Sequence, residues 1–316
     1  RTVMKNVVLG IDIGGTNTVY GFVGQNGNIV HSEQIPTLGN KPVDNLITRL
    51  GEKLDSFLKD HSDFKLCGIG VGAPNGNHFT GIIQDPPNLS WGDVDIVTLL
   101  KEKFNCDVSL TNDANAAALG ERNYGIASDM NDFVVITLGT GLGSGIFTGG
   151  LLLYGTNSLA GEIGHLSIAK NGRACSCGLK GCLEMYVSAK GIKETVIELQ
   201  KVNPDDDFLS SLEPDSIEGE MIDRAIDNGV ESAISLYEFT ADKLAYGMAQ
   251  VATILSPEAF ILYGGYSQAG DRLLGPTRIA LETYLMDNLK GKIKVLQSGL
   301  PPGQAGILGA ASLLWE

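Results

Sequence analysis

Two spacings of apolar residues recur along the chain and predict its strands and helices. Short runs rich in apolar residues, bounded by turn-forming residues, are typical of buried strands. They occupy residues 7–13, 18–23, 29–35, 66–71, 108–110, 133–138, 259–262 and 292–296. Apolar positions three and four residues apart, or runs of strong helix formers, are typical of helices. These patterns occupy residues 42–59, 94–104, 114–121, 185–200, 232–255 and 303–314, and the alternation of the two kinds of element predicts an α/β fold.

Residues 201–219 follow neither spacing. Two acidic stretches stand in this segment, Asp205-Asp206-Asp207 and Glu213-Pro214-Asp215. Because charge clusters without apolar periodicity are typical of solvated chain, we expect an irregular surface excursion here.

Two of the predicted strands lead into glycine turns that share one pattern. The run at 7–13 continues into Gly14-Gly15-Thr16-Asn17, and the run at 133–138 continues into a turn that contains Thr140 and Gly141. Asp12 and Thr137 occupy matching places before the two turns, 137 − 12 = 125 residues apart. A repeated strand–turn–strand unit suggests a duplicated fold. A single Gly-Gly-Thr turn would indicate only a tight hairpin, whereas a pair of such turns can hold the phosphates of a nucleotide.

Neither turn matches the common nucleotide-binding motifs. The Gly-Lys-Ser/Thr of a P-loop is missing, and a strand follows the glycines where a Rossmann fold has a helix. A third glycine pair, Gly264-Gly265, stands between a predicted strand and a predicted helix, which suits contact with an adenine nucleotide. The chain is strongly acidic, with a net charge of −14, so we expect the phosphates to be held locally by backbone amides and Mg²⁺.

A third motif gathers thiols and an imidazole into one short segment, residues 161–184. His165, Cys175, Cys177 and Cys182 form a Cys₃His set, the ligand combination of a closed structural zinc site. Incidental buried thiols are the alternative, but a dense Cys/His cluster in a reducing compartment favours a metal.

Two carboxylates flank these ligands. Glu162 precedes His165 by three residues and Glu184 follows Cys182 by two, so metal binding would draw both carboxylates together. Four protein ligands leave no open coordination position, and we therefore expect zinc to be a scaffold. The carboxylates beside it would bind a polyhydroxylated ligand.

Composition and charge narrow the class of partner. The chain has 316 residues, enough for two domains with full cores. Its net charge of −14 argues against nucleic acid and anionic membranes as partners. No apolar run approaches the ~20 residues of a membrane span, and the first six residues lack the apolar segment of a signal peptide. With its thiols committed to metal, we expect the protein in the cytoplasm.

These motifs together resemble those of the ROK family of bacterial sugar kinases and sugar-responsive repressors. The likeness rests on Asp-Ile-Gly-Gly-Thr-Asn at 12–17, Thr-Asn-Asp-Ala-Asn at 111–115, Glu-Ile-Gly-His at 162–165 and Cys-x-Cys-Gly-x-x-Gly-Cys-x-Glu at 175–184. It extends from about residue 7 to the C-terminus. One departure is Tyr266, where many relatives carry a third glycine.

The resemblance implies a fold and an activity. The fold would be the duplicated ribonuclease H-like fold of actin/hexokinase-like ATPases, with two domains and a cleft between them. One domain would comprise residues 1–112 completed by a helix at about 303–316, and the other residues 113–302. The activity would be ATP-dependent phosphorylation of a hexose, foremost glucose, at its 6-hydroxyl, with Mg²⁺ and structural Zn²⁺ as cofactors. Members of the family are commonly homodimers.

The resemblance also implies roles for single residues. Asp113 would be the catalytic base, which is compatible with the alternative that Asp113 or Asn112 caps the helix that follows. Asn88 would line the sugar cleft, although an Asn after two prolines equally suits a turn. The remaining sugar hydroxyls would contact Asn112, Glu162, His165 and Glu184, with His165 binding zinc through its other ring nitrogen. ATP would contact Asp12, Gly14, Gly15, Thr16, Asn17, Thr140, Gly141, Gly264 and Gly265.

Other functions stay open at this point. A sugar-responsive repressor carries an N-terminal helix-turn-helix of several dozen residues, and here the first predicted strand begins about seven residues in. A zinc-containing sugar-binding module without catalysis would leave the glycine turns and Asp113 without a role. The sequence does not choose among glucose, mannose, fructose, N-acetylmannosamine and N-acetylglucosamine, and it does not fix the oligomeric state.

Overall fold

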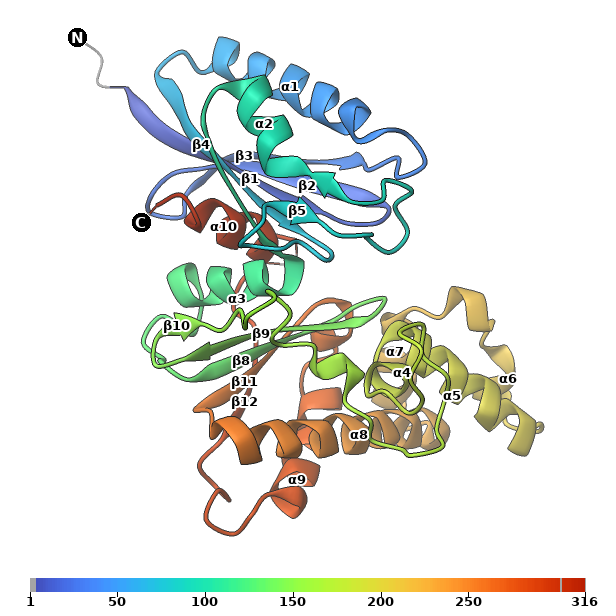
Figure 1. Ribbon diagram of the computed structural model, residues 1–316. Coiled ribbons are helices and arrows are strands. Elements are labelled where there is room, and N and C mark those ends of the chain that lie inside the picture. Colours follow the sequence, from blue (N-terminus) through green and yellow to red (C-terminus); the bar gives the residue numbers. More distant parts are fainter. Residues whose placement is uncertain (1–3, 302, 316) are drawn as a thin grey trace. The chain divides into compact units, whose positions relative to one another are not determined.

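The structure, a computed structural model, describes residues 4–301 and 303–315 (Figure 1). The chain folds into two compact units, unit 1 and unit 2. Unit 1 holds the described residues of 1–129, 152–160 and 299–316, and unit 2 those of 130–151 and 161–298. The chain therefore returns to unit 1 twice.

The sheet of unit 1 combines a hairpin meander with parallel strands. Within residues 4–301 and 303–315, this sheet has five strands in the order β3-β2-β1-β4-β7, and a separate two-stranded pair is formed by β5 and β6. β1, β2 and β3 are antiparallel neighbours, whereas β4 and β7 run parallel to β1. The carboxyl ends of the three parallel strands meet at one edge of the sheet. The strands are β1 (Lys5–Ile13), β2 (Asn17–Val23), β3 (Ile29–Pro36), β4 (Phe64–Ala73), β5 (Ile82–Ile83), β6 (Val94–Asp95) and β7 (Asp107–Asn112).

Helices cover both faces of this sheet (Figure 1). α1 (Val43–Asp60) and α2 (Ile96–Phe104) pack on one face, in an apolar cluster that includes Leu9 of β1. α10 (Ala305–Ser312) packs on the other face, where Val8 and Leu308 share a second cluster. Consecutive strand residues point to opposite faces, so β1 is buried on both sides and reads as a continuous apolar run.

The domain boundary expected at residue 113 stays a prediction. In the structure the alanine-rich helix that begins there, α3 (Asp113–Tyr124), packs against α10 within unit 1. Small side chains on both helices allow this close approach.

Unit 2 repeats the topology of unit 1. Among the described residues its sheet has the strand order β10-β9-β8-β11-β12, with β8 antiparallel to β9 and parallel to β11. β1 ends at Ile13 and β8 at Leu138, so the offset of 138 − 13 = 125 residues matches the one expected from the sequence. The duplicated α/β fold is confirmed. The strands are β8 (Phe133–Leu138), β9 (Leu142–Thr148), β10 (Leu151–Leu152), β11 (Ala259–Tyr263) and β12 (Lys294–Gln297).

The helices of unit 2 gather around α8, whose packed face is fully buried. α4, α5, α6, α7 and α9 all contact it. The elements are η1 (Ile163–His165), α4 (Glu184–Val187), α5 (Ala189–Val202), α6 (Asp207–Ser211), η2 (Pro214–Ser216), α7 (Gly219–Asp227), α8 (Glu231–Leu255), η3 (Gly265–Ala269) and α9 (Asp271–Tyr284).

Two expectations about local structure in unit 2 need correction, the second only in part, because residues 201–219 are largely exposed as expected but are not irregular throughout. The single helix expected over 185–200 is divided at Ser188, whose extended backbone separates α4 from α5 and whose hydroxyl accepts the N–H of Gly191 at 3.4 Å. The acidic segment contains α6 and η2, and it is anchored because Leu209 and Leu212 are buried and the side-chain amide of Gln200 donates to both of their carbonyls at 2.7 and 2.9 Å. Two anchoring leucines are too few to produce a visible period.

No helix in the described part of the chain combines the length and the apolar character needed to cross a membrane.

Candidate active site

The first glycine turn joins β1 to β2 and is held on two sides. The N–H of Gly14 donates to the carbonyl of Asn17 at 2.9 Å, and the hydroxyl of Thr37 donates to the carbonyl of Gly14 at 2.7 Å. Thr16 and Asn17 are exposed at the tip, where their polar groups are accessible.

Asn88 lies directly against this turn. A Cβ built on Gly15 would be 3.2 Å from the Cβ of Asn88. Asn88 is exposed and has a φ of 65°, the left-handed conformation that asparagine tolerates in turns. Its geometry therefore suits a turn residue whose amide remains available to a ligand.

Two carboxylates meet at the edge of the sheet where β1 and β7 end. Asp12 is the penultimate residue of β1, and Asp113 follows β7 as the first residue of α3. Desolvation by surrounding protein, followed by the charge on Asp113, raises the pKa of Asp12 to about 7. The pKa of Asp113 is also raised by desolvation, although the N–H of Ala114, which donates to Oδ1 of Asp113 at 2.8 Å, acts in the opposite direction. Carboxylates with raised pKa values are typical of catalytic and cation-binding positions.

The start of α3 carries both residues considered for the helix cap, Asn112 and Asp113. Asn112 is the N-cap, and its Oδ1 accepts the N–H of Ala114 at 2.9 Å. Asp113 stands one residue later at an exposed position, although surrounding protein still desolvates its carboxylate. It lies at a helix end whose dipole favours negative charge. Asn112 and Asp113 therefore both accept the N–H of Ala114, Asn112 as the N-cap.

Gly306, in the first turn of α10, was not singled out from the sequence, yet it contacts Asp12. A Cβ at position 306 would lie 2.4 Å from Oδ2 of Asp12. No local motif marks this contact, because the two residues are 306 − 12 = 294 positions apart.

The second glycine turn joins β8 to β9 in unit 2. The N–H of Gly139 donates to the carbonyl of Gly141 at 3.0 Å, and Thr140 is exposed at the tip. Gly264 has a φ of 106°, and a Cβ there would lie 2.4 Å from the carbonyl oxygen of Leu138 at the end of β8. Gly265, which opens η3, has open space around its Cβ position. The nucleotide-binding residues expected in unit 2 thus lie together, at the carboxyl ends of β8 and β11.

Leu142 joins this turn to the carboxylates that flank the cysteine motif. Its N–H donates to Oε2 of Glu184 at 2.9 Å, and a Cβ on Gly164 would lie 2.6 Å from its carbonyl oxygen. The η1 turn carries Glu162 and His165 on either side of Gly164. One backbone unit therefore fixes both segments that carry the expected sugar-binding groups, a relation that the sequence motif does not display.

The four expected metal ligands come together in unit 2. The ligand atoms of His165, Cys175, Cys177 and Cys182 all lie within 4.8 Å of one another. Sγ of Cys175 is 3.7 Å from Nδ1 of His165, and Sγ of Cys177 is 3.6 Å from Sγ of Cys182. A tetrahedron with Zn–S bonds of about 2.3 Å has edges of about 3.8 Å, close to these two separations, so the donor set is compatible with a zinc ion.

The two ring nitrogens of His165 face different groups. Nδ1 faces Cys175, whereas Nε2 lies 3.9 Å from Oε2 of Glu162. The ring can therefore bind a metal on one side and present its other nitrogen, beside a carboxylate, to a ligand.

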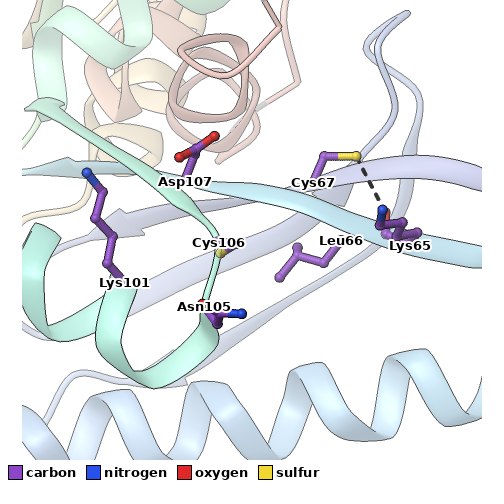
Figure 2. A pocket seen from close by; sticks show the side chains of 7 residues that line it. All are labelled: Lys65, Leu66, Cys67, Lys101, Asn105, Cys106 and Asp107. Carbon is purple, nitrogen blue, oxygen red and sulfur yellow. Dashed lines mark hydrogen bonds between the residues drawn. The ribbon is translucent and has the colours of Figure 1, made fainter.

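A hollow in unit 1 lies away from the site residues of that unit. It has a volume of about 540 Å³ and is lined by residues that include Lys65, Cys67, Lys101 and Cys106 (Figure 2). It lies at the amino ends of β4 and β7, whereas ligands of open α/β sheets bind at the carboxyl ends. Cys67 packs with the cluster on the α10 face and Cys106 with that on the α1 face, so the two thiols lie on opposite faces of the sheet.

Comparison with known proteins gives a consistent result over the whole length of the chain. The model of the ROK family matches residues 8–316. A glucokinase of Thermotoga maritima is 33% identical over 99% of this chain and 98% of the relative. The crystal structure of a ROK family glucokinase from Streptomyces griseus in complex with glucose and AMPPNP superposes with a TM-score of 0.83 at 29% identity, covering 97% of this chain and 98% of that one.

The comparison also reaches regulators. A xylose repressor of Bacillus spizizenii is 30% identical over 81% of this chain and 62% of the repressor. The matched region thus occurs in proteins with different functions, and the site must decide between them.

Proposed function

The chain belongs to the ROK family, and we propose that it is an ATP-dependent hexose kinase that converts glucose to glucose 6-phosphate. The observation that carries this proposal is the position of Asp113, an accessible carboxylate with a raised pKa at the start of α3. The glucokinase of T. maritima and the S. griseus glucokinase complex with glucose and AMPPNP support the choice of acceptor and donor.

Asp113 acts as the general base. It takes the proton of the 6-hydroxyl while the oxygen of that hydroxyl forms its bond to the γ-phosphorus of ATP, and the bond from this phosphorus to the bridging oxygen breaks so that ADP leaves. A raised pKa brings the carboxylate closer to the basicity that this transfer needs.

The other hydroxyls of the sugar are held by amide, imidazole and carboxylate groups. These acceptors and donors suit a neutral polyol better than an anionic substrate, because two of them are carboxylates. The residues proposed for this role are Asn88, Asn112, Glu162, His165 and Glu184.

The nucleotide is held by the glycine turns. Backbone N–H groups of Gly15, Thr140 and Gly141, with the side chains of Thr16 and Asn17, bind phosphate oxygens, and Gly264 and Gly265 contact the nucleoside. Gly14 shapes the first turn, because its N–H is bonded to the carbonyl of Asn17. Asp12 fits a Mg²⁺ ion, because its carboxylate is a hard oxygen donor whose charge is unfavourable beside Asp113 without a cation. Bound Mg²⁺ neutralises charge on the phosphates during transfer.

Zinc has a structural role in this proposal. His165, Cys175, Cys177 and Cys182 would hold it as a closed set of four ligands, so it offers no position for substrate. Its contribution is to fix the segment between Glu162 and Glu184.

A coupled assay that measures ADP formation with ATP over a panel of hexoses tests the proposal. We expect turnover with glucose, and activity on another hexose with none on glucose would reassign the substrate. The family's repressors make sugar-dependent regulation the alternative function, and an absence of ADP formation with every hexose, together with measurable sugar binding, would favour it.

Three further properties are proposed. A homodimer is favoured by exposed apolar side chains on α8 and α9, namely Tyr246, Ile254, Ile279 and Tyr284. Light scattering on the purified protein measures the oligomeric state. A cytoplasmic location agrees with a thiolate metal site. The functional domains are proposed to be 1–112 with 303–316, and 113–302.

A further inference from the structure

Arg173 has an unusually complete set of hydrogen-bond partners. Its side chain is 10% exposed. Nε and Nη2 donate to the two carboxylate oxygens of Glu198 at 3.0 and 2.6 Å, and Nη2 also donates to the hydroxyl of Thr195 at 2.9 Å. Nη1 donates to the carbonyls of Met185 at 2.7 Å and Gly191 at 2.9 Å. A guanidinium has five N–H donors, and all five have an acceptor here.

These acceptors belong to the elements that follow the metal-binding segment. Met185 is in α4 next to Glu184, and Gly191, Thr195 and Glu198 are in α5. Arg173 itself lies two residues before Cys175. Its side chain therefore joins the metal-binding segment to the short helix that carries Glu184.

Tyr186 reinforces the same connection. The guanidinium lies 4.6 Å from the centre of the Tyr186 ring, and the backbone N–H of Arg173 donates to the Tyr186 hydroxyl at 3.1 Å. The carbonyl of Arg173 accepts the N–H of Gly181 at 2.8 Å, one residue before Cys182. Both ends of the cysteine segment thus converge on Arg173.

We propose that Arg173 is a positioning residue that links occupancy of the metal site to sugar affinity, by holding α4 and Glu184 in register with the four metal ligands. The link to the sugar rests on the proposed function. Lysine cannot replace arginine here, because an ammonium group has three donors on a single atom and cannot reach acceptors on two helices.

Thermodynamic linkage makes the proposal measurable from both directions. If metal and sugar stabilise the same arrangement of α4, each must strengthen the binding of the other by the same factor. Glucose should therefore strengthen zinc binding, and removal of zinc should weaken glucose binding. We expect the stronger zinc binding to appear as slower zinc release. Breaking the connection at Arg173 should reduce both effects together.

The experiment compares the zinc-loaded wild-type protein with Arg173→Lys and with Arg278→Lys, a control for the same substitution at another arginine of unit 2. Arg278 is also in unit 2, and it donates to the carbonyl of Val295 and to Asp271, far in sequence from the cysteine segment. Zinc release into a chromogenic chelator is followed with and without saturating glucose, and KM and kcat for glucose are measured in parallel.

We expect the Arg173 variant to raise KM at least tenfold while kcat changes by less than about threefold, and to lose the protection of zinc by glucose that the wild type and the Arg278 variant show. Wild-type KM and full protection in Arg173→Lys would overturn the inference. If that variant does not fold, Glu198→Gln and Tyr186→Phe each weaken one contact, and unchanged protection in both would overturn it as well.

Failure of the proposed function would be visible separately. A wild type that shows no turnover of glucose contradicts the kinase assignment. The role of Arg173 in holding the metal-binding segment is then tested by the rate of zinc release without sugar. That rate should still be faster in Arg173→Lys than in Arg278→Lys.

Discussion

The carboxylate of Glu184 accepts a hydrogen bond from the backbone N–H of Leu142 across 42 residues of sequence, at 2.9 Å. The carbonyl of the same Leu142 faces Gly164, in the turn that carries Glu162 and His165. The sugar-binding groups proposed for unit 2 are therefore aligned by one backbone unit at the start of β9. Gly164 has no side chain, yet this arrangement predicts that a substitution at Gly164 disturbs sugar binding.

Gly164→Ala tests this alignment. The added Cβ would lie 2.6 Å from the carbonyl oxygen of Leu142, so η1 must move away from β9. Displacements of about 1 Å in positioning groups can cost about 10²-fold in rate, and we expect kcat/KM for glucose to fall by about 10–100-fold, chiefly through KM. Gly51→Ala in α1 is the control, because its Cβ would have ordinary contacts, the nearest being 3.4 Å from the Phe104 ring. Steady-state kinetics that show equal effects of the two variants would refute the alignment.

Metal content gives a second prediction. We expect about one zinc per chain by plasma emission, and Cys177→Ser should lose it, lower the melting temperature and raise KM for glucose. Nucleotide binding at the glycine turns should change little, because these turns keep their own hydrogen bonds. Fully active protein that contains no zinc would contradict the structural role of the metal.

The parts of this molecule that sequence patterns reveal are those whose physics is local. The apolar runs before Gly14 and Gly139 predict β1 and β8, and their offset of 125 residues predicts the duplication that the two sheets display. The cysteine cluster predicts a metal site because its four ligands lie close together in the sequence, between residues 165 and 182. In the structure their ligand atoms lie within 4.8 Å of one another.

Contacts between distant segments were beyond reach of the same patterns. Nothing near Gly306 indicates that it faces Asp12, and nothing near Leu142 indicates that it receives Glu184, since these pairs are made by tertiary packing. Arg173 resembles any surface arginine in the sequence, and only its five acceptors, drawn from two later helices, distinguish it.

Asp113→Asn separates catalysis from folding. Asparagine keeps the shape of the side chain and an oxygen that can accept the N–H of Ala114, while it cannot accept a proton from the sugar. We expect kcat to fall by about 10²–10⁴-fold, with glucose affinity measured by calorimetry within a few-fold of wild type. The helix cap is unaffected because Asn112 supplies it. A variant that keeps more than about a tenth of the wild-type kcat would exclude Asp113 as the base.

The raised pKa of Asp12 predicts that this residue costs stability at alkaline pH. The folded protein holds the proton of Asp12 up to a pKa of about 7, whereas the unfolded chain releases it near the ordinary value of 3.8. Stability associated with this proton is therefore complete below the unfolded pKa and is lost as pH rises through 7. Asp12→Asn carries no such charge, so in the absence of nucleotide and Mg²⁺ it should melt higher than wild type at pH 8.5 and at about the same temperature at pH 4. A rise of at least about 2–4 °C is expected, the change that 1 kcal/mol produces in a domain of roughly this size.

Asp63→Asn provides a control of opposite sign. The hydrogen bond from Lys5, at 3.0 Å, lowers the pKa of Asp63, so this carboxylate adds stability that is present above the unfolded pKa and lost as the solution becomes acid. Its variant should therefore melt lower than wild type at pH 8.5 and converge with it at low pH. Scanning calorimetry of the three proteins at both pH values decides the matter, because a general effect of removing negative charge would shift both variants in the same direction. Should Asp12→Asn melt below wild type at pH 8.5, the carboxylate would be stabilising as an anion, and its proposed need for a cation would be wrong.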